Sequence, residues 1–307
     1  MMKKLILIFL LFASCVLKVS SQTDPLYTQF MTNPFLVNPA LAGTYPYYQI
    51  ITNNRLQWTG WTDAPINNVI SMFGPMVSQP MGVGGYIMHE SWGLTSKTTL
   101  SGTYAYYYGI AEDLKISMGL AVGLIQFKID GSGHTEYYDQ VYAGQTYTKL
   151  APDATLGLYL YSSMYHVGVS LTRLFGNKLP IGSEDSVITN LSRITRNVYL
   201  HAGYKYLINR ELALEPTLIL RKSPATPFQV DVNVRVWYGK RQWENNKIWG
   251  GLSFRSQDAV TIMVGFTYQR KIEIGYSYDI GVNKMRSFHS GSHELMIGFK
   301  FNEIKEY

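Results

Sequence analysis

The chain has 307 residues, of which 46% are hydrophobic and 14% aromatic, but only 16% are charged, with a formal net charge of +6. Soluble domains carry about a quarter charged residues, so this composition does not fit a chain surrounded by water. The aromatic content excludes a disordered coil. After residue 21, no apolar run approaches the about 18 residues that a transmembrane helix needs. The basic residues form no cluster, which argues against a nucleic-acid partner.

The first 21 residues have the pattern of a secretory signal peptide. Lys3 and Lys4 precede an apolar stretch at 5–13, and small residues lead to a cut after Ser21. A cut before Cys15, the only cysteine, is the alternative and would produce a lipoprotein. Removing the first 21 residues also removes three lysines, which lowers the formal charge from +6 to +3.

A leader at residues 22–46 differs in pattern from the rest of the chain. Two Asn-Pro steps, Asn33-Pro34 and Asn38-Pro39, predict fixed turns, because proline sets φ and asparagine tolerates turn geometry. The leader is also rich in aromatic and aliphatic residues, which a plain linker would leave in water. We therefore expect an ordered segment that packs at a periplasmic mouth or enters a lumen.

Residues 47–307 predict an all-β protein. From residue 97 onward, apolar residues alternate with small or polar ones, which is the two-residue period of a strand. The apolar face suits lipid with an aromatic girdle, and the face of Gly, Ser, Ala, Thr and Tyr suits an enclosed lumen. A soluble β-sandwich would instead be rich in Lys and Glu on its outer positions. The pattern thus favours a transmembrane outer-membrane β-barrel in contact with lipid.

The alternation predicts about 14 antiparallel strands. Connections after even-numbered strands are mostly tight, whereas several after odd-numbered strands are long, notably 130–153, 175–195 and 282–291. Outer-membrane barrels have short periplasmic turns, so this arrangement predicts that both termini are periplasmic. The predicted strands are 47–58, 66–74, 81–90, 97–110, 113–129, 154–163, 165–174, 196–208, 211–222, 226–240, 246–255, 259–270, 272–282 and 292–303.

The polar face carries charges of both signs, which predicts ion pairs that brace a filled or narrow barrel. A selective channel would gather charges of one sign. A specific contact with a partner inside the lumen is the alternative. The residues expected to point inward are His166, His201, Lys205, Glu215, Arg221, Asp231, Arg235, Arg255, Glu273, Asp279, Glu294 and Lys300.

Several motifs resemble the PorP/SprF family of Bacteroidetes outer-membrane proteins, and the double Asn-Pro leader is the most specific of them. The likeness extends from about the signal peptide to the last strand. The leader motifs are Asp24-Pro25, Gln29-Phe30, Asn33-Pro34, Asn38-Pro39-Ala40 and Ala42-Gly43. Those that follow are Arg55-Leu56-Gln57-Trp58, Ala64-Pro65, Gly82-Val83-Gly84 and the strand from Leu114 to Asp130.

The resemblance implies a role in type IX secretion and gliding motility. Family members pair with a large secreted adhesin through its C-terminal sorting domain, or associate with periplasmic ring subunits of the secretion system. A porin or substrate-selective channel is the alternative function. Contacts with a partner or a plug are expected at Asn33, Pro34, Asn38, Pro39, Gly43, Arg55, Trp58, Arg235 and Arg255.

Enzymatic motifs are missing from the sequence, so we expect neither catalysis nor a cofactor. It has no Gly-x-Ser-x-Gly elbow and no His-Glu-x-x-His. His289 and His293 flank a Ser-Gly-Ser turn without a nearby cysteine, so we expect no metal there. Residues 130–136 lack the spacing of a calcium loop. Strand glycines at a bend or beside the leader explain Gly82, Gly84 and Gly85 better than a phosphate site does.

Overall fold

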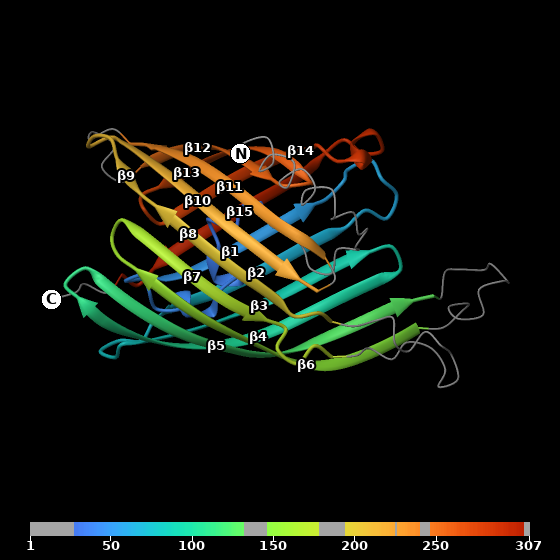
Figure 1. Cartoon of the computed structure of the whole chain (residues 1–307), viewed down its shortest axis with the longest axis horizontal. Coiled ribbons are helices and arrows are strands. Elements are labelled where there is room, and N and C mark those ends of the chain that lie inside the picture. The colour runs from blue at the N-terminus through green and yellow to red at the C-terminus, as the bar shows by residue number, and fades with distance from the viewer. Residues whose placement is uncertain (1–27, 132–145, 178–193, 225, 240–245, 304–307) are drawn as a thin grey trace, which may run out of the picture.

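The computed structural model describes residues 28–131, 146–177, 194–224, 226–239 and 246–303. These residues form a single closed antiparallel β-barrel of 14 strands, and residues 28–47, which precede the first strand, lie inside it (Figure 1). One of these 14 strands is divided into two segments, β8 and β9. Within the described residues, no helix is long and apolar enough to cross a membrane. The predicted signal peptide lies outside the described residues.

The strands follow one another around the barrel in sequence order. Closure comes from pairing of the first strand with the last, for example Tyr48 with Phe301, while β10 pairs with β11 on the far side. The strands are β1 (Tyr48–Leu56), β2 (Ile66–Pro75), β3 (Met81–Trp92), β4 (Thr95–Ala111), β5 (Leu114–Asp130), β6 (Thr146–Tyr161), β7 (Tyr165–Thr172), β8 (Asn197–Tyr204), β9 (Tyr206–Leu207), β10 (Leu212–Ser223), β11 (Thr226–Tyr238), β12 (Lys247–Arg255), β13 (Ala259–Tyr268), β14 (Ile272–Gly281) and β15 (Ser292–Phe301).

The two ends of the barrel differ, and we name them by their connections. The tight-turn end holds the start of β1, the end of β15 and short connections such as 112–113, 162–164 and 269–271. The loop end holds the longer connections, including 57–65 and 282–291. Most connections at the tight-turn end are short, as predicted, but 93–94 and 256–258 at the loop end are short as well. The predicted long connections 130–153 and 175–195 lie largely outside the described residues.

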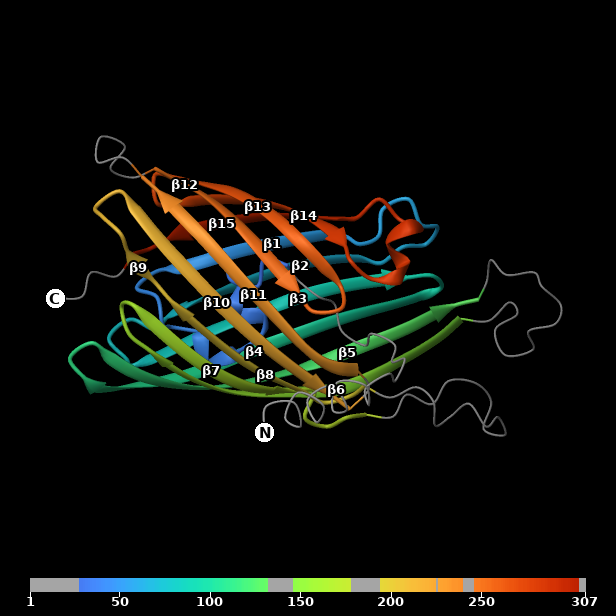
Figure 2. The same ribbon diagram turned by 45° about the horizontal axis from the view of Figure 1, so that its top comes forward.

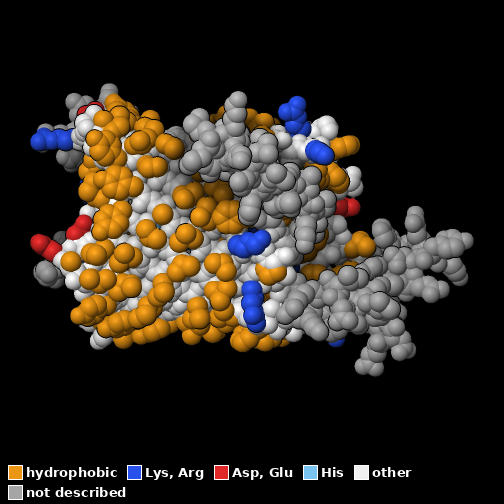
Figure 3. All heavy atoms as spheres, in the orientation of Figure 1, with side chains coloured by type: hydrophobic (Ala, Val, Ile, Leu, Met, Phe, Trp, Pro, Cys, Tyr) orange, Lys and Arg blue, Asp and Glu red, His pale blue; other side chains and the backbone are white. Residues whose placement is uncertain are grey.

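The outer face of the wall is apolar, as the alternation predicted. In β13, Ile262, Val264 and Phe266 are exposed, whereas Thr261 and Met263, which alternate with them, are buried. Hydrophobic side chains spread widely over the visible wall (Figure 3). A soluble monomer does not expose apolar surface on this scale, but a lipid-facing wall requires it.

The strands differ from the prediction in two places. β6 begins at Thr146 rather than at 154, because β5 extends to Asp130 and offers backbone partners over its whole length. The predicted loop 130–153 is correspondingly shorter. The predicted strand 196–208 is interrupted between β8 and β9 at Lys205, whose backbone N–H bonds to Met164 O in the neighbouring turn.

Candidate functional site: the occupied lumen

The leader runs through the barrel lumen. Its described part begins at Thr28, beside the loop-end parts of β14 and β15, and ends at Tyr47 at the tight-turn end. Between them lie two 3₁₀ helices, η1 (Pro34–Leu36) and η2 (Pro39–Leu41), the second of which packs against β4, β5 and β6. In Figure 2 this segment lies within the ring of strands. Of the two positions that the sequence allowed, the structure thus shows the lumen.

An ion network fills the loop-end half of the lumen. Arg55 Nη2 lies 2.6 Å from Asp279 Oδ2, and Arg55 Nη1 lies 3.3 Å from Glu294 Oε2. Arg255 lies 3.2 Å from Asp231 and 2.9 Å from Asp258. All of these side chains project from the wall toward the axis. The predicted bracing by ion pairs of mixed sign is therefore confirmed. We call the six residues the luminal ion network; they are Arg55, Asp231, Arg255, Asp258, Asp279 and Glu294.

The start of the leader completes this network. The backbone N–H groups of Thr28 and Gln29 donate to the two carboxylate oxygens of Glu294, at 2.8 and 3.2 Å. The Thr28 hydroxyl donates to Asp279 and accepts from Arg55 at 2.8 Å and from Arg255 at 3.2 Å. The network has more carboxylates than guanidinium groups, and buried charges are stable only when they are paired and hydrogen-bonded. The leader therefore supplies donors that the wall alone lacks.

Each Asn-Pro step starts a 3₁₀ helix and ties it to the wall. Asn33 donates from Nδ2 to Asn53 Oδ1 at 2.9 Å and to Ser71 Oγ at 3.0 Å. Asn38 accepts from the backbone N–H of Ala40 through Oδ1, and its Nδ2 donates to Leu158 O at 2.9 Å. The following prolines fit the first helical position, where no N–H is needed. The turns predicted at both steps are therefore present.

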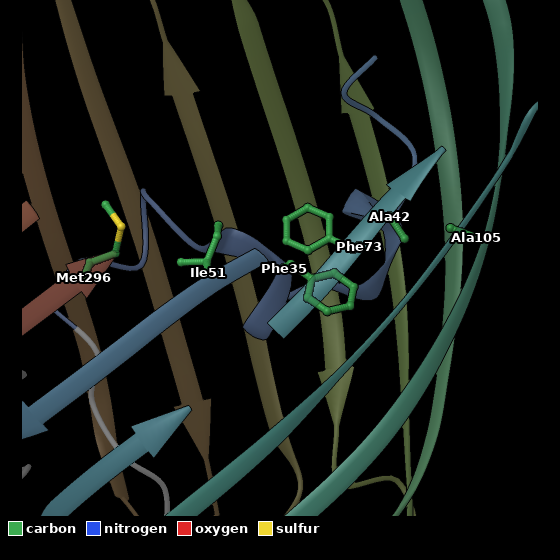
Figure 4. Packing of buried hydrophobic residues seen from close by; sticks show 6 residues of the cluster. All are labelled: Phe35, Ala42, Ile51, Phe73, Ala105 and Met296. Atoms are coloured by element: carbon green, nitrogen blue, oxygen red, sulfur yellow. The ribbon is translucent and has the colours of Figure 1, made fainter. Parts of the chain in front are cut away.

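An apolar cluster holds the middle of the leader against the wall. Phe35 stacks on Phe73 of β2, with ring centroids 4.3 Å apart and planes 16° apart (Figure 4). Ala42, Ile51, Ala105 and Met296 complete this cluster. Most of the lumen wall is polar, so this patch gives the leader a specific place to bury its aromatic ring.

Small residues allow the leader backbone to lie directly on the wall. Gly43 has φ of +80°, a left-handed conformation that favours glycine, and its Cα face lies against Gly82 of β3. A side chain on Gly119 of β5 would collide with the backbone of Pro39 and Ala40. Gly82 and Gly84 do lie beside the leader, as the sequence predicted. The contact of Gly119 gives no signal in the sequence, because alternation alone cannot show what a luminal glycine faces.

Arg235 takes part in a second arrangement, nearer the tight-turn end. Its Nη2 lies 3.0 Å from Glu215 Oε1, and its guanidinium lies 5.0 Å and 5.5 Å from the ring centres of Trp237 and Trp249. Trp237 also donates from Nε1 to Glu215 at 2.6 Å. The side chain of Arg235 is buried, so its interactions are within the wall. Beside this group, burial raises the pKa of the leader phenols Tyr45 and Tyr47 above their usual value, so both are neutral.

Trp58, the remaining predicted site residue, lies away from the leader at the loop end. Its ring lies 6.2 Å from that of Trp61 and 6.1 Å from that of His289, and Trp61 lies 6.3 Å from Phe288. Backbone bonds between Thr59 and residues 290 and 291 join the two loops that carry these rings. Trp61 and Phe288 are 43% and 69% exposed. We call Trp58, Trp61, Phe288 and His289 the loop-end aromatic cluster.

A cavity of about 90 Å³ remains between the leader and one side of the wall. Its lining includes Phe35 and Leu36 of the leader and Arg173, Arg221 and Asp231 of the wall. Such a volume holds only a few water molecules, at about 30 Å³ each. The described part of the leader thus lies against one side of this small cavity.

The fold and the lumen together define the class of protein, which is an outer-membrane β-barrel with the described part of its N-terminal segment inside the lumen. The chain belongs to the PorP/SprF family of type IX secretion system membrane proteins, whose family model matches residues 19–299. No curated protein matches it.

Solved outer-membrane barrels resemble the chain in fold. A deltaS2S3 mutant of the monoaromatic hydrocarbon channel TodX is 7% identical, with a TM-score of 0.50 over 88% of this chain and 94% of that chain. The monoaromatic hydrocarbon channel CymD is 11% identical, with a TM-score of 0.49 over 94% of this chain and 95% of that chain. A Pseudomonas aeruginosa FadL homologue is 10% identical, with a TM-score of 0.47 over 83% and 88%. At these identities the likeness concerns the barrel fold alone.

Proposed function

We propose that this barrel is a plugged, non-enzymatic anchor of the type IX secretion and gliding-motility system, which holds a secreted adhesin-like protein at the cell surface. The partner would bind through its C-terminal sorting domain. One observation carries the proposal: the described part of the leader lies in the lumen and is fixed to the wall by hydrogen bonds from Thr28, Asn33 and Asn38. A barrel that occupies its own lumen is suited to holding a partner rather than to passing solutes. Family membership supports the link to type IX secretion.

The loop-end aromatic cluster supports a docking role for that end. Trp61 and Phe288 are exposed side by side on two loops joined by backbone hydrogen bonds. Aromatic side chains on a rigid support are enriched among residues that carry binding energy in protein interfaces. Outer-membrane barrels place their long loops outside the cell. The proposed orientation therefore puts this cluster at the cell surface and the tight-turn end, where β15 ends, in the periplasm. The described leader begins at Thr28 toward the loop end, so the periplasmic position of the N-terminus stays a prediction.

Isolation from native membranes tests the anchor. The barrel is extracted from the outer membrane with a mild detergent, and we expect a large surface protein to co-purify with it. Recovery of the barrel alone across several detergents and salt concentrations would contradict the proposal.

A porin is the alternative, in keeping with the channel names of the structural neighbours. Conductance in planar bilayers distinguishes the two functions. A barrel plugged by its leader should be nearly silent, whereas steady conductance of the intact chain would favour the porin.

A further inference from the structure

The tight-turn end opens onto a cavity of about 600 Å³ that the luminal network does not fill. Its wall comes from the ends of β10, β11, β12, β13 and β15 together with the turns between them. We call this cavity the basic vestibule. Its charged lining residues are Lys205, Arg210, Glu211, Lys247, Arg270, Lys271, Lys300 and Glu303.

The vestibule carries a clear excess of positive charge, with six basic and two acidic lining residues. Lys247 lies within electrostatic reach of Lys205, Arg270 and Lys300. Lys300 is paired with Glu273 at 3.0 Å. In the described part of the chain, no carboxylate lies within ion-pair distance of Lys205 or Lys247. Deeper in the lumen, by contrast, Arg55, Arg235 and Arg255 all have carboxylate partners.

This contrast indicates a site for an anionic ligand. Like charges gathered in a concave wall repel one another and focus a positive potential into the cavity. A bound anion would relieve that repulsion, as the carboxylates do deeper in the lumen. Arg55, Arg235 and Arg255 are thus paired inside the lumen, whereas the vestibule holds six cations against two carboxylates.

Two aromatic residues in the lining of the basic vestibule indicate which kind of anionic ligand it would bind. Tyr47 and Trp237 line it, and Lys300 Nζ lies 5.5 Å from the Tyr47 ring centre. Aromatic rings beside ammonium and guanidinium groups offer both apolar contact and charge, which suits a polypeptide that carries carboxylates. A flat lipid surface cannot enter a cavity enclosed by strand ends.

We infer that the basic vestibule binds an acidic polypeptide segment of a partner protein. In the orientation given under the proposed function, on which this placement rests, the partner is periplasmic. Binding itself depends only on the charges and the shape of the vestibule. The barrel would then hold one partner at each end, with the leader between them.

The test uses the full-length barrel in detergent and a fluorescent polyglutamate peptide of about 20 residues, with binding followed by anisotropy. We expect binding that weakens as salt rises, because exposed charge pairs are screened within about 10 Å at 0.1 M salt. The triple variant Lys205→Glu, Arg210→Glu, Lys247→Glu should weaken binding by about tenfold or more. The matched control, Lys128→Glu, Lys284→Glu, Arg286→Glu, makes the same change in net charge at the loop end and should leave binding within about twofold.

Three outcomes would overturn the inference: no binding by the parent barrel, equal weakening by both triple variants, or competition for the peptide by anionic phospholipid vesicles that bind the same lysines. If the reversal variant does not fold, Lys205→Gln with Lys247→Gln takes its place, with the heat-induced gel shift of the barrel as a check on folding. This result is separable from the anchor proposal. Loss of peptide binding leaves co-purification of a surface protein untouched, and failure of co-purification leaves the peptide titration valid.

Discussion

Arg55 of β1 and Asp279 of β14 form an ion pair of 2.6 Å inside the lumen, with 1% and 3% of their side chains exposed. Their strands are not neighbours, because β15 lies between them. The Thr28 hydroxyl bonds to both side chains, so the pair joins two parts of the wall and the leader at one point. The same set of interactions therefore holds the leader in the lumen and stabilises the wall of the barrel.

Replacement of Arg55 by alanine should be strongly destabilising. Arg55→Ala leaves Asp279 and Glu294 buried without their main cation, and breaking a buried pair costs about 3–5 kcal/mol. Thermal unfolding in detergent measures the loss. Lys128→Ala is the matched control, since the Lys128–Asp130 pair is 44% and 40% exposed, and such pairs contribute at most about 1 kcal/mol. Equal decreases in unfolding temperature in the two variants would show that the luminal ion pair stabilises the fold no more than the exposed pair does.

A side chain at Gly119 should displace the leader. Gly119→Val places its methyl groups against Pro39 and Ala40, and overpacking of this kind costs about 1–3 kcal/mol. If the leader moves to relieve the clash, the lumen opens and planar-bilayer conductance rises. Gly102→Val is the control, because a Cβ there meets nothing within 4 Å. A silent Gly119→Val barrel with parent stability would contradict the close packing of the leader.

The sequence predicts the strands of the wall and their two faces far better than it predicts the contacts of the leader. Alternation identifies which residues face lipid and which face the lumen, so it predicted that Arg255, Asp279 and Glu294 point inward, whereas Arg55 was singled out only by the family motif. It cannot show which luminal charges meet across the barrel, since that depends on closure and shear. Alternation likewise gave no role to Thr28, whose contacts all lie more than 20 residues away in the chain.

The position of the leader can be tested by cross-linking. The side chains of Asn33 and Ser71 are 3.0 Å apart, so the pair Asn33→Cys, Ser71→Cys should react with a short thiol cross-linker in intact membranes. Cys15, the only native cysteine, is replaced by serine. Ile70 is the control partner, because it is the next residue of β2 but is 49% exposed on the lipid face. Cross-linking of both pairs, or of neither, would contradict a leader held in the lumen, and gel mobility reports the result.

The loop-end aromatic cluster gives the sharpest test of docking. Trp61 and Phe288 are exposed, and no ring contact or hydrogen bond joins them to the described part of the leader or to the luminal ion network, so Trp61→Ala with Phe288→Ala should leave folding intact. Truncation of an interface residue of this kind to alanine weakens the binding free energy by about 2 kcal/mol. A change of about 1.4 kcal/mol corresponds to a tenfold change in affinity. We therefore expect the amount of surface protein co-isolated per barrel to fall by about tenfold or more.

The matched control for that pair removes two aromatic rings from the lipid-facing wall. Phe254 and Phe266 are 50% and 39% exposed on β12 and β13, so Phe254→Ala with Phe266→Ala deletes similar apolar area away from the loop-end aromatic cluster. Partner retention should be unchanged in this variant, while both double variants keep the heat-induced gel shift of a folded barrel. Equal losses of partner would mean that the rings act through insertion into lipid, and unchanged retention in both would place the docking surface elsewhere on the barrel. Only a loss confined to the loop-end variant is consistent with an anchor that holds its partner outside a plugged lumen.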